Sequence, residues 1–201
     1  MRLADFAPRH AGKIPVMPVF STMGEPEDLR PFAQREPWLV LFGGGAWTSA
    51  AVSTNTEVLD RICTALGCDR IIAIGPRAKN EWPGRTAFDE TGVLPASEVS
   101  AVLRRARAGY LAYFPGYLGK SSIFGAYCAH GLVPVFPEHN PSERDAVIQG
   151  THYLTTSDLM DDSSPERLAS VATAAHRWYE DHTLAKTSAV VAQTLEGISA
   201  C

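Results

Sequence analysis

Short apolar segments alternate with stretches that have helical periodicity, and this alternation constrains the fold more than any other feature. The apolar segments are residues 38–42 (WLVLF), 70–75 (RIIAIG), 110–114 (YLAYF) and 132–136 (LVPVF), with residues 152–155 as a candidate fifth. Strands buried on both faces of a parallel sheet have this composition. Strands that alternate with helices are joined by right-handed crossovers. The sequence therefore predicts an α/β fold, a Rossmann-like open parallel sheet with helices on both faces.

The helices between these segments have recognisable ends. Thr54 and Glu57 form a capping box at the start of the first, and Gly67 ends it. Further helices are predicted at 96–107, at 121–130 before Gly131, and at 184–197. Ser164 caps another helix, with Pro165 at its first position. The spacing of these signals predicts that the chain closes with two terminal helices, starting at about residue 164.

The first 36 residues differ in character from the rest. Prolines at positions 8, 15, 18, 26 and 31 interrupt any long helix there, so residues 1–36 are predicted to be an extension of the interdomain-linker type. Residues 37–201 then form one Rossmann-like domain. A chain of 201 residues is long enough for such a core, because a domain of this size buries roughly 70% of its unfolded surface.

Composition excludes several functions. The formal charge is −4 and no basic cluster is present, which argues against nucleic-acid binding. The four cysteines (Cys63, Cys68, Cys128, Cys201) lack metal-ligand spacing and indicate reduced thiols. No D-x-D pair occurs, so no metal and no cofactor are expected. No signal peptide or membrane-spanning segment is recognisable, which predicts a cytoplasmic protein and leaves open peripheral attachment to a membrane.

The glycine-rich loop after the first strand allows a backbone to approach a ligand closely. A dinucleotide fingerprint would need Gly43, Gly45 and a third glycine at position 48, which is Thr48. It would also need an acidic residue after the second strand, where Arg77 stands in the sequence IGPR. An NAD-dependent oxidoreductase is therefore the weakest of the hypotheses considered. A tight turn without any ligand remains an alternative for this loop.

The loop at 115–122 (PGYLGKSS) is the more informative one. It precedes a helix whose first N–H groups carry partial positive charge, and Lys120, Ser121 and Ser122 add a cation and two hydroxyls. These groups suit a diphosphate, although the glycine spacing of a Walker loop is absent. Arg77 and Lys79 are placed to approach the same phosphates from the opposite wall. The alternatives are an ordinary N-cap at Ser121 and solvated Lys120, Arg77 and Lys79.

The order of a glycine-rich first loop, a basic second loop and the loop at 115–122 resembles that of a known family. The sequence GYLGKSSIFGAYCAHGLVPV is similar to the C-terminal, donor-binding domain of GT-B-fold glycosyltransferases, in which a helix, a glycine and an apolar Pro-Val strand follow one another. Residues 14–26 (IPVMPVFSTMGEP) are similar to the linker between the two halves of such enzymes. The closing HRWYEDHTLAKTSAVVAQTL resembles their terminal helices.

The resemblance implies a role for each candidate residue. Gly44 and Gly45 would lie against the diphosphate of a nucleoside-diphosphate sugar. Lys120, Ser121 and Ser122 would hold it and stabilise the leaving nucleoside diphosphate in place of a metal. The remaining assignments are phosphate contacts for Arg77 and Lys79, the base pocket for Leu94 and ribose for Glu138.

One departure concerns catalysis. Many retaining members carry two glutamates eight positions apart, and the matching positions here are Leu118 and Ala126. A GT-B enzyme uses two facing domains, and 201 residues are enough for only one of them. The expected acceptor domain is therefore not in this sequence, and no catalytic base can be assigned. The sequence thus predicts the donor half of a hexosyltransferase that works with an N-terminal acceptor domain. The alternative is a non-catalytic nucleotide-binding or interaction module of the same fold.

Overall fold

A computed structural model of the chain describes residues 17–44, 56–77, 81–113, 115–138 and 144–199. Six parallel strands form one sheet with the order β3-β2-β1-β4-β5-β6. The strands are β1 (Glu36–Phe42), β2 (Arg70–Ile74), β3 (Ala87–Gly92), β4 (Ala106–Tyr110), β5 (Val133–Phe136) and β6 (Leu154–Thr155). The predicted Rossmann-like α/β fold is confirmed, and this strand order is the one typical of dinucleotide-binding domains.

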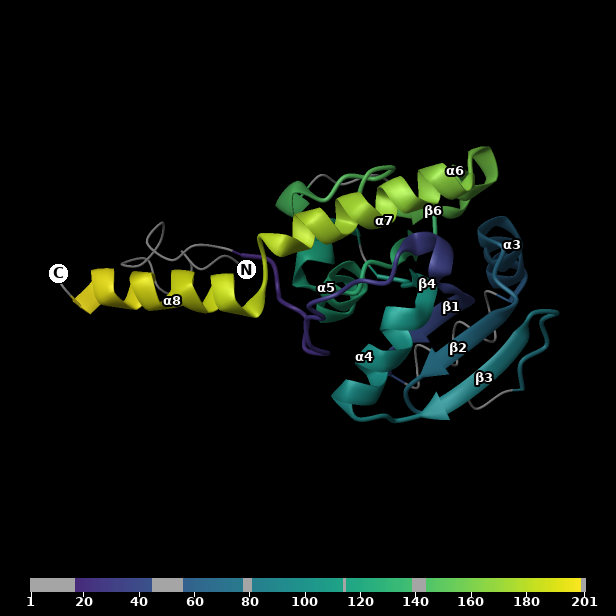
Figure 1. The fold of residues 1–201 in the computed structure, drawn as a ribbon, viewed down its shortest axis with the longest axis horizontal. Helices are drawn as coiled ribbons and strands as arrows, with labels where there is room; N and C mark the ends of the chain where they lie inside the picture. Colours follow the sequence, from purple (N-terminus) through teal and green to yellow (C-terminus); the bar gives the residue numbers. More distant parts are fainter. Residues whose placement is uncertain (1–16, 45–55, 78–80, 114, 139–143, 200–201) are drawn as a thin grey trace.

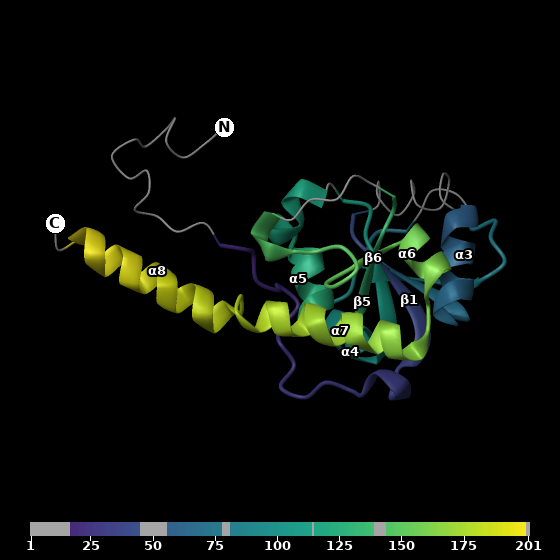
Figure 2. The same ribbon diagram turned by 90° about the horizontal axis from the view of Figure 1, so that it is seen from above.

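Helices cover both faces of the sheet (Figures 1 and 2). They are α3 (Thr56–Leu66), α4 (Ala96–Arg105), α5 (Ser122–Ala129), α6 (Thr156–Asp161), α7 (Pro165–Glu180) and α8 (Leu184–Ser199), with short 3₁₀ turns η2 (Phe32–Gln34), η3 (Pro115–Lys120) and η4 (Arg144–Ala146). Side chains of β1 alternate between the two layers. Val40 packs in the core that includes α4 and α5, whereas Leu39 and Leu41 pack in the core that includes α3. The apolar segment at 38–42 is buried on both faces for this reason.

The predicted helix ends are confirmed where the structure describes them. Gly67 and Gly131 have φ angles of +61° and +66°, the left-handed conformation that closes α3 and α5. Ser164 accepts a hydrogen bond from the backbone of Arg167 and has Pro165 after it, as predicted for the start of α7. Thr54, the other half of the predicted capping box with Glu57, lies outside the described residues.

Three predictions about elements are wrong. The polar stretch after β2 contains a strand, β3, which lies at the edge of the sheet. Its residues alternate between exposed and half-buried, so it has no continuous apolar run. The third predicted strand is displaced, since β4 spans Ala106–Tyr110 and not 110–114. Strand β4 includes Gly109, on which Tyr127 of α5 packs closely. Helix α6 lies between β6 and α7, where none was predicted, and is closed at its start by a capping box of Thr155 and Asp158.

Helix α8 extends away from the rest of the molecule in both views (Figures 1 and 2). Leu184, Val191 and Leu195 on this helix are 48%, 46% and 59% exposed. An apolar stripe that stays in solvent offers a surface for another protein segment. Its start is tied to the body of the domain by the carboxylate of Glu25, which accepts a hydrogen bond from the N–H of Leu184.

Candidate functional site

The strand order reverses between β1 and β4, and in open α/β sheets ligands bind beyond the carboxyl ends of the strands at this point. The chain extends from β1 in one direction to β2 and β3, and from β4 in the other direction to β5 and β6. The loops that follow β1 and β4 are the glycine-rich loop and the 115–122 loop, the two predicted to bind a diphosphate. Both loops therefore start at the same edge of the sheet, where the topology places the expected ligand crevice.

The floor of the crevice is the place where β1 and β4 separate. The last residue pair between them is Leu41 with Tyr110. Beyond it, the N–H of Gly43 donates to Ile74 of β2 at 3.2 Å, and the N–H of Leu111 donates to Val135 of β5 at 2.9 Å. Each strand end therefore pairs outward, which leaves backbone groups between the two ends without a strand partner.

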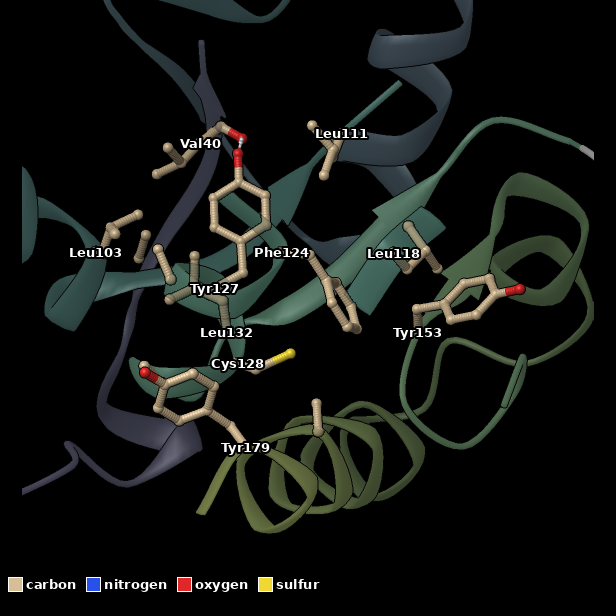
Figure 3. Close-up of a cluster of buried hydrophobic side chains, with 14 of the residues drawn as sticks. Val40, Leu103, Leu111, Leu118, Phe124, Tyr127, Cys128, Leu132, Tyr153 and Tyr179 are labelled. Carbon is tan, nitrogen blue, oxygen red and sulfur yellow. Dashed lines mark hydrogen bonds between the residues drawn. The ribbon is translucent and has the colours of Figure 1, made fainter. Parts of the chain in front are cut away.

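The hydroxyl of Tyr127 fills that gap. It lies 3.3 Å from the carbonyl of Val40 (Figure 3). It also accepts a hydrogen bond from the N–H of Phe42 at 3.2 Å and lies 3.2 Å from the carbonyl of Tyr110. Burial raises the pKa of this phenol, so the hydroxyl remains protonated and able to donate. Gly109 makes room for the ring, because a Cβ there would lie 2.6 Å from it.

A second close contact shapes the loop after β1. The backbone of Gly75 has a φ of +135°, and a Cβ at that position would lie 2.1 Å from the carbonyl oxygen of Gly43. Only glycine fits this approach. Gly44, which follows, is exposed, and a Cβ on it would meet no atom within 4 Å. A side chain at position 44 would therefore meet no steric obstacle, and Gly45 lies outside the described residues.

The other loop begins α5. Ser121 is the N-cap, which is the alternative that the sequence left open for this residue, and its hydroxyl accepts a hydrogen bond from the N–H of Phe124 at 3.2 Å. Ser121 is 6% exposed, and Ser122, the first residue of the helix, is partly buried. The chain does not run directly from strand to helix as predicted, because η3 separates β4 from α5. The 3₁₀ turn places Leu118 in the core and Lys120 at the surface.

Lys120 makes a contact that the sequence did not indicate. Its ammonium donates to the carbonyl of Met17 at 3.0 Å. The next contact along the same segment is a hydrogen bond from the N–H of Val19 to Gly119 at 2.7 Å, and Val19 also packs against Gly125 of α5. Residues 17–25, which we call the crossing segment, thus lie over the start of the helix.

The far end of the crossing segment is fixed to the terminal helices. The N–H of Ser21 donates to the hydroxyl of Tyr179 at 2.7 Å. That hydroxyl in turn donates to Glu25, which also accepts from the start of α8. A single segment therefore contacts the proposed phosphate-binding loop and the helix that projects from the domain.

The other candidate residues are spread along the carboxyl edge of the sheet. Arg77 follows β2 and is exposed; Leu94 follows β3 and packs partly against the core that contains α5. Glu138 follows β5, is exposed, and accepts a hydrogen bond from the N–H of Ser157 at 2.6 Å. Lys79 lies outside the described residues. Leu118 and Ala126, which stand where the resembling family has glutamates, are both buried among apolar side chains.

His130 is the C-cap of α5, and it supplies no positive charge there. Burial lowers the pKa of His130 to about 4, so the ring is neutral at pH 7. Its Nδ1 lies 2.8 Å from the carbonyl of Ala126, and its Nε2 lies 2.8 Å from the hydroxyl of Ser100. The histidine is a packing residue far from solvent, not a catalytic one.

Cys63, Cys68 and Cys128 are free and buried, in agreement with the prediction of reduced thiols. Burial raises the pKa of the Cys63 thiol to about 12, which makes it unreactive at neutral pH. Across the described ranges, no group of three or more His, Cys, Asp or Glu side chains is arranged to hold a metal ion. No helix within those same ranges is long and apolar enough to cross a membrane.

Solved structures that resemble this one are glycosyltransferases. The GtfA/B complex matches with a TM-score of 0.62 over 92% of this chain and 39% of that chain, at 11% identity. An alpha-glucosyltransferase (AGT) in complex with UDP matches with a TM-score of 0.57 over 86% and 53%, at 10% identity. The alpha,alpha-trehalose 6-phosphate synthase of Burkholderia multivorans matches with a TM-score of 0.53 over 85% and 44%, at 12% identity.

The fold is that of a GT-B glycosyltransferase domain. Identities of 10–12% establish the fold and nothing finer. The chain covers about half or less of each of these three structures, which are correspondingly longer. No family model and no curated protein matches the sequence.

Two residues that shape the GT-B-like crevice were missed from the sequence. The sequence places Tyr127 within the helix predicted at 121–130, and Gly109 between the helix predicted at 96–107 and the strand predicted at 110–114. The signal available for both was a glycine in the middle of an apolar stretch, which often marks a close approach of another group. Which group makes that approach becomes visible only when α5 is packed on the sheet.

Proposed function

We propose that the chain is the donor-binding half of a metal-independent hexosyltransferase. It binds a nucleoside-diphosphate sugar and stabilises the nucleoside diphosphate that leaves when the hexosyl group is transferred. The observation that supports this most strongly is that the glycines after β1 and the segment leading to α5 after β4 follow the two strands between which the strand order reverses. The GT-B fold adds a class of enzyme in which a crevice of this kind holds a sugar donor.

The diphosphate would be held largely by backbone groups. The N–H groups of Ser122 and Ile123 are in the first turn of α5 and have no partner within the helix. They carry the partial positive charge of the helix start, to which the ammonium of Lys120 adds, and Gly44 and Gly45 are proposed to lie against the same diphosphate. As the bond from the anomeric carbon to the phosphate oxygen breaks, negative charge grows on the diphosphate. Groups already aimed at that position lower the barrier without a metal.

Lys120 must change partner in this mechanism. Its ammonium is bound to the carbonyl of Met17 and is exposed, so a phosphate oxygen competes with that carbonyl for it. A charged acceptor forms the stronger hydrogen bond. Arg77 and Lys79 are proposed to approach from the β2 side, and Leu94 to line the base pocket.

The acceptor half is proposed to be a second domain that contacts the projecting side of this one. Helix α8 exposes Leu184, Val191 and Leu195, and the crossing segment ends at Glu25 beside the start of this helix. A partner domain covering that stripe would also touch the segment that holds Lys120. The catalytic base would belong to the partner. We propose the cytoplasm as the compartment, which agrees with free thiols at three buried cysteines.

Calorimetric titration of the chain with UDP, GDP and ADP tests the donor site. We expect one of the three to bind with micromolar affinity, and Lys120→Gln to weaken that binding about three- to tenfold with a reduced dependence on salt. Lys186→Gln, which removes an exposed lysine of α8, is the matched control and should change nothing. Binding of all three nucleotides that is millimolar or weaker would contradict the proposal.

A second function is favoured by one observation. Leu118 and Ala126 are buried and apolar where retaining relatives of this fold carry glutamates, as in a domain that keeps the fold but binds without catalysis. Lys120→Gln and Ser121→Ala in the chain recombined with its acceptor half separate the two functions. Loss of transfer supports the enzyme, and unchanged transfer supports a non-catalytic nucleotide-binding or interaction module.

A further inference from the structure

A cavity of about 360 Å³ opens at the carboxyl edge of the sheet, on the side away from β2 and β3. It lies between α3 and the start of α6, below the ends of β5 and β6. Its walls are contributed by Val58, Arg61, Pro137, Glu138, Thr156 and Ser157. The volume is in the lower part of the roughly 300–1,000 Å³ range of small-molecule sites, too small for a whole nucleotide sugar.

The polar groups of the cavity are partly unused. One oxygen of the Glu138 carboxylate accepts from the N–H of Ser157. Arg61 is exposed and has no ion pair among the residues that the structure describes. Thr156 is only 7% exposed, yet its hydroxyl has no hydrogen-bond partner in the described part of the chain. A buried hydroxyl without a partner is costly unless a ligand or water supplies one.

These groups match the chemistry of a sugar ring. A carboxylate accepts hydrogen bonds from hydroxyls, and a guanidinium donates to them. Val58 and Pro137 provide apolar surface of the kind that the C–H face of a pyranose contacts. The two charges are opposite in sign, so the cavity favours a neutral polyhydroxyl ligand over a phosphate.

The position of the cavity agrees with the direction of a bound donor. If Leu94, after β3, lines the base pocket and the diphosphate lies between β1 and β4, the ribose lies on the β2 side of the diphosphate. The hexose then extends toward β5 and β6. The cavity is about two strand spacings from the reversal of strand order, or about 10 Å.

We propose that this cavity binds a hexopyranose ring, with Glu138 and Arg61 as its hydroxyl-binding residues. The orientation of the ring relative to a nucleotide rests on the proposed function. Two sources supply the same chemistry, namely the hexosyl group of the donor and a separate sugar. Under either source Glu138 contacts a hexose, not the ribose assigned to it from the sequence.

The full chain, labelled with ¹⁵N, tests the proposal by NMR. The amide of Ser157 is the reporter because it donates to Glu138. The probes are UDP and GDP, the corresponding UDP-glucose, UDP-galactose, UDP-N-acetylglucosamine and GDP-mannose, and the four free sugars. Glu138→Gln and Arg61→Gln are the test variants, with Glu57→Gln on α3 and Arg104→Gln on α4 as matched controls outside the cavity.

We expect at least one sugar-containing probe to shift the Ser157 amide saturably, and Glu138→Gln to weaken that effect about tenfold while both controls leave it unchanged. A shift from a nucleotide sugar alone identifies the donor hexose, and one from a free sugar identifies a separate ligand. No shift from any sugar probe overturns the proposal, even if UDP or GDP binds. An equal shift from UDP alone also overturns it, because the cavity then takes the ribose. A shift caused by a free sugar, with no binding of any nucleotide, would support the sugar-binding cavity and refute the proposed donor site.

Discussion

Replacing Tyr127 with phenylalanine removes a single oxygen atom, at the place where β1 and β4 separate. The ring stays, so the core of α5 against the sheet loses almost no apolar contact. What disappears is the acceptor for the N–H of Phe42 and the donor shared by the carbonyls of Val40 and Tyr110. The strand ends have no alternative partner for Phe42, since Gly43 and Leu111 already pair outward.

The expected loss of stability follows from the N–H of Phe42, which loses its acceptor. A buried donor left without a partner costs about 1–3 kcal/mol, and Phe42 is only partly buried, which places the value near the middle of that range. We expect the free energy of unfolding to fall by about 2 kcal/mol. In a chain of this size that lowers Tm by about 4–8 °C.

Urea denaturation followed by tryptophan fluorescence measures the change, because Trp178 packs in the same core as Tyr127. Tyr113→Phe is the control, since that tyrosine is 41% exposed. The nucleotide affinity should fall together with stability, because the loops after β1 and β4 both start at this point. A loss of stability no larger than that of Tyr113→Phe would refute the idea that the hydroxyl joins the two strands.

Three further perturbations test other parts of the fold. Asp60→Ala removes the acceptor of three hydrogen bonds from Arg85 and Thr86, and should lower the free energy of unfolding by about 3 kcal/mol in urea denaturation, more than Asp69→Ala on the surface. Gly75→Ala forces a Cβ against the carbonyl of Gly43, so it should lower Tm strongly and abolish nucleotide binding, whereas Gly44→Ala should leave Tm unchanged. Burial lowers the pKa of His130 from 6.5 to about 4. As the pH falls, His130 is therefore protonated in the unfolded chain before it is protonated in the folded chain. The stability due to the neutral ring is therefore complete above pH 6.5 and lost as pH falls toward 4, by about 3 kcal/mol in total. His130→Asn should flatten that part of the pH dependence in urea denaturation, and an unchanged slope would contradict the assignment.

The fold was predictable because most of its signals are local. Continuous apolar strands at 38–42 and 132–136, the glycines at 67 and 131, and the Ser164-Pro165 start of α7 each act within a few residues. The errors arose where tertiary packing decides. Strand β4 was placed four residues late because YLAYF is more apolar than ARAGY, yet small side chains are what α5 requires beneath it. Edge strand β3 was missed because every second residue is exposed, so the strand has no continuous apolar run.

The candidate site was predictable in part for the same reason. The loops after β1 and β4 were found because any parallel sheet places such loops at one edge. The partner of Lys120 was not, because Met17 is 103 positions away in the sequence and meets the lysine only after the crossing segment packs on α5. Leu118 and Ala126 were identified as departures from a motif, but only the structure shows that both are closed off from solvent.

The crossing segment connects two features that the sequence presented separately. Met17 and Val19 bind Lys120 and Gly119 at the start of α5, while Ser21 and Glu25 bind Tyr179 and the start of α8. A domain that packs on α8 therefore acts on Glu25, which is eight residues along the same segment from Met17, whose carbonyl holds Lys120. Binding of an acceptor half and release of this lysine to a phosphate are then linked, and linkage is reciprocal. If the proposed function is correct, nucleotide affinity should rise when the acceptor half is present, and Lys120→Gln should remove most of that increase.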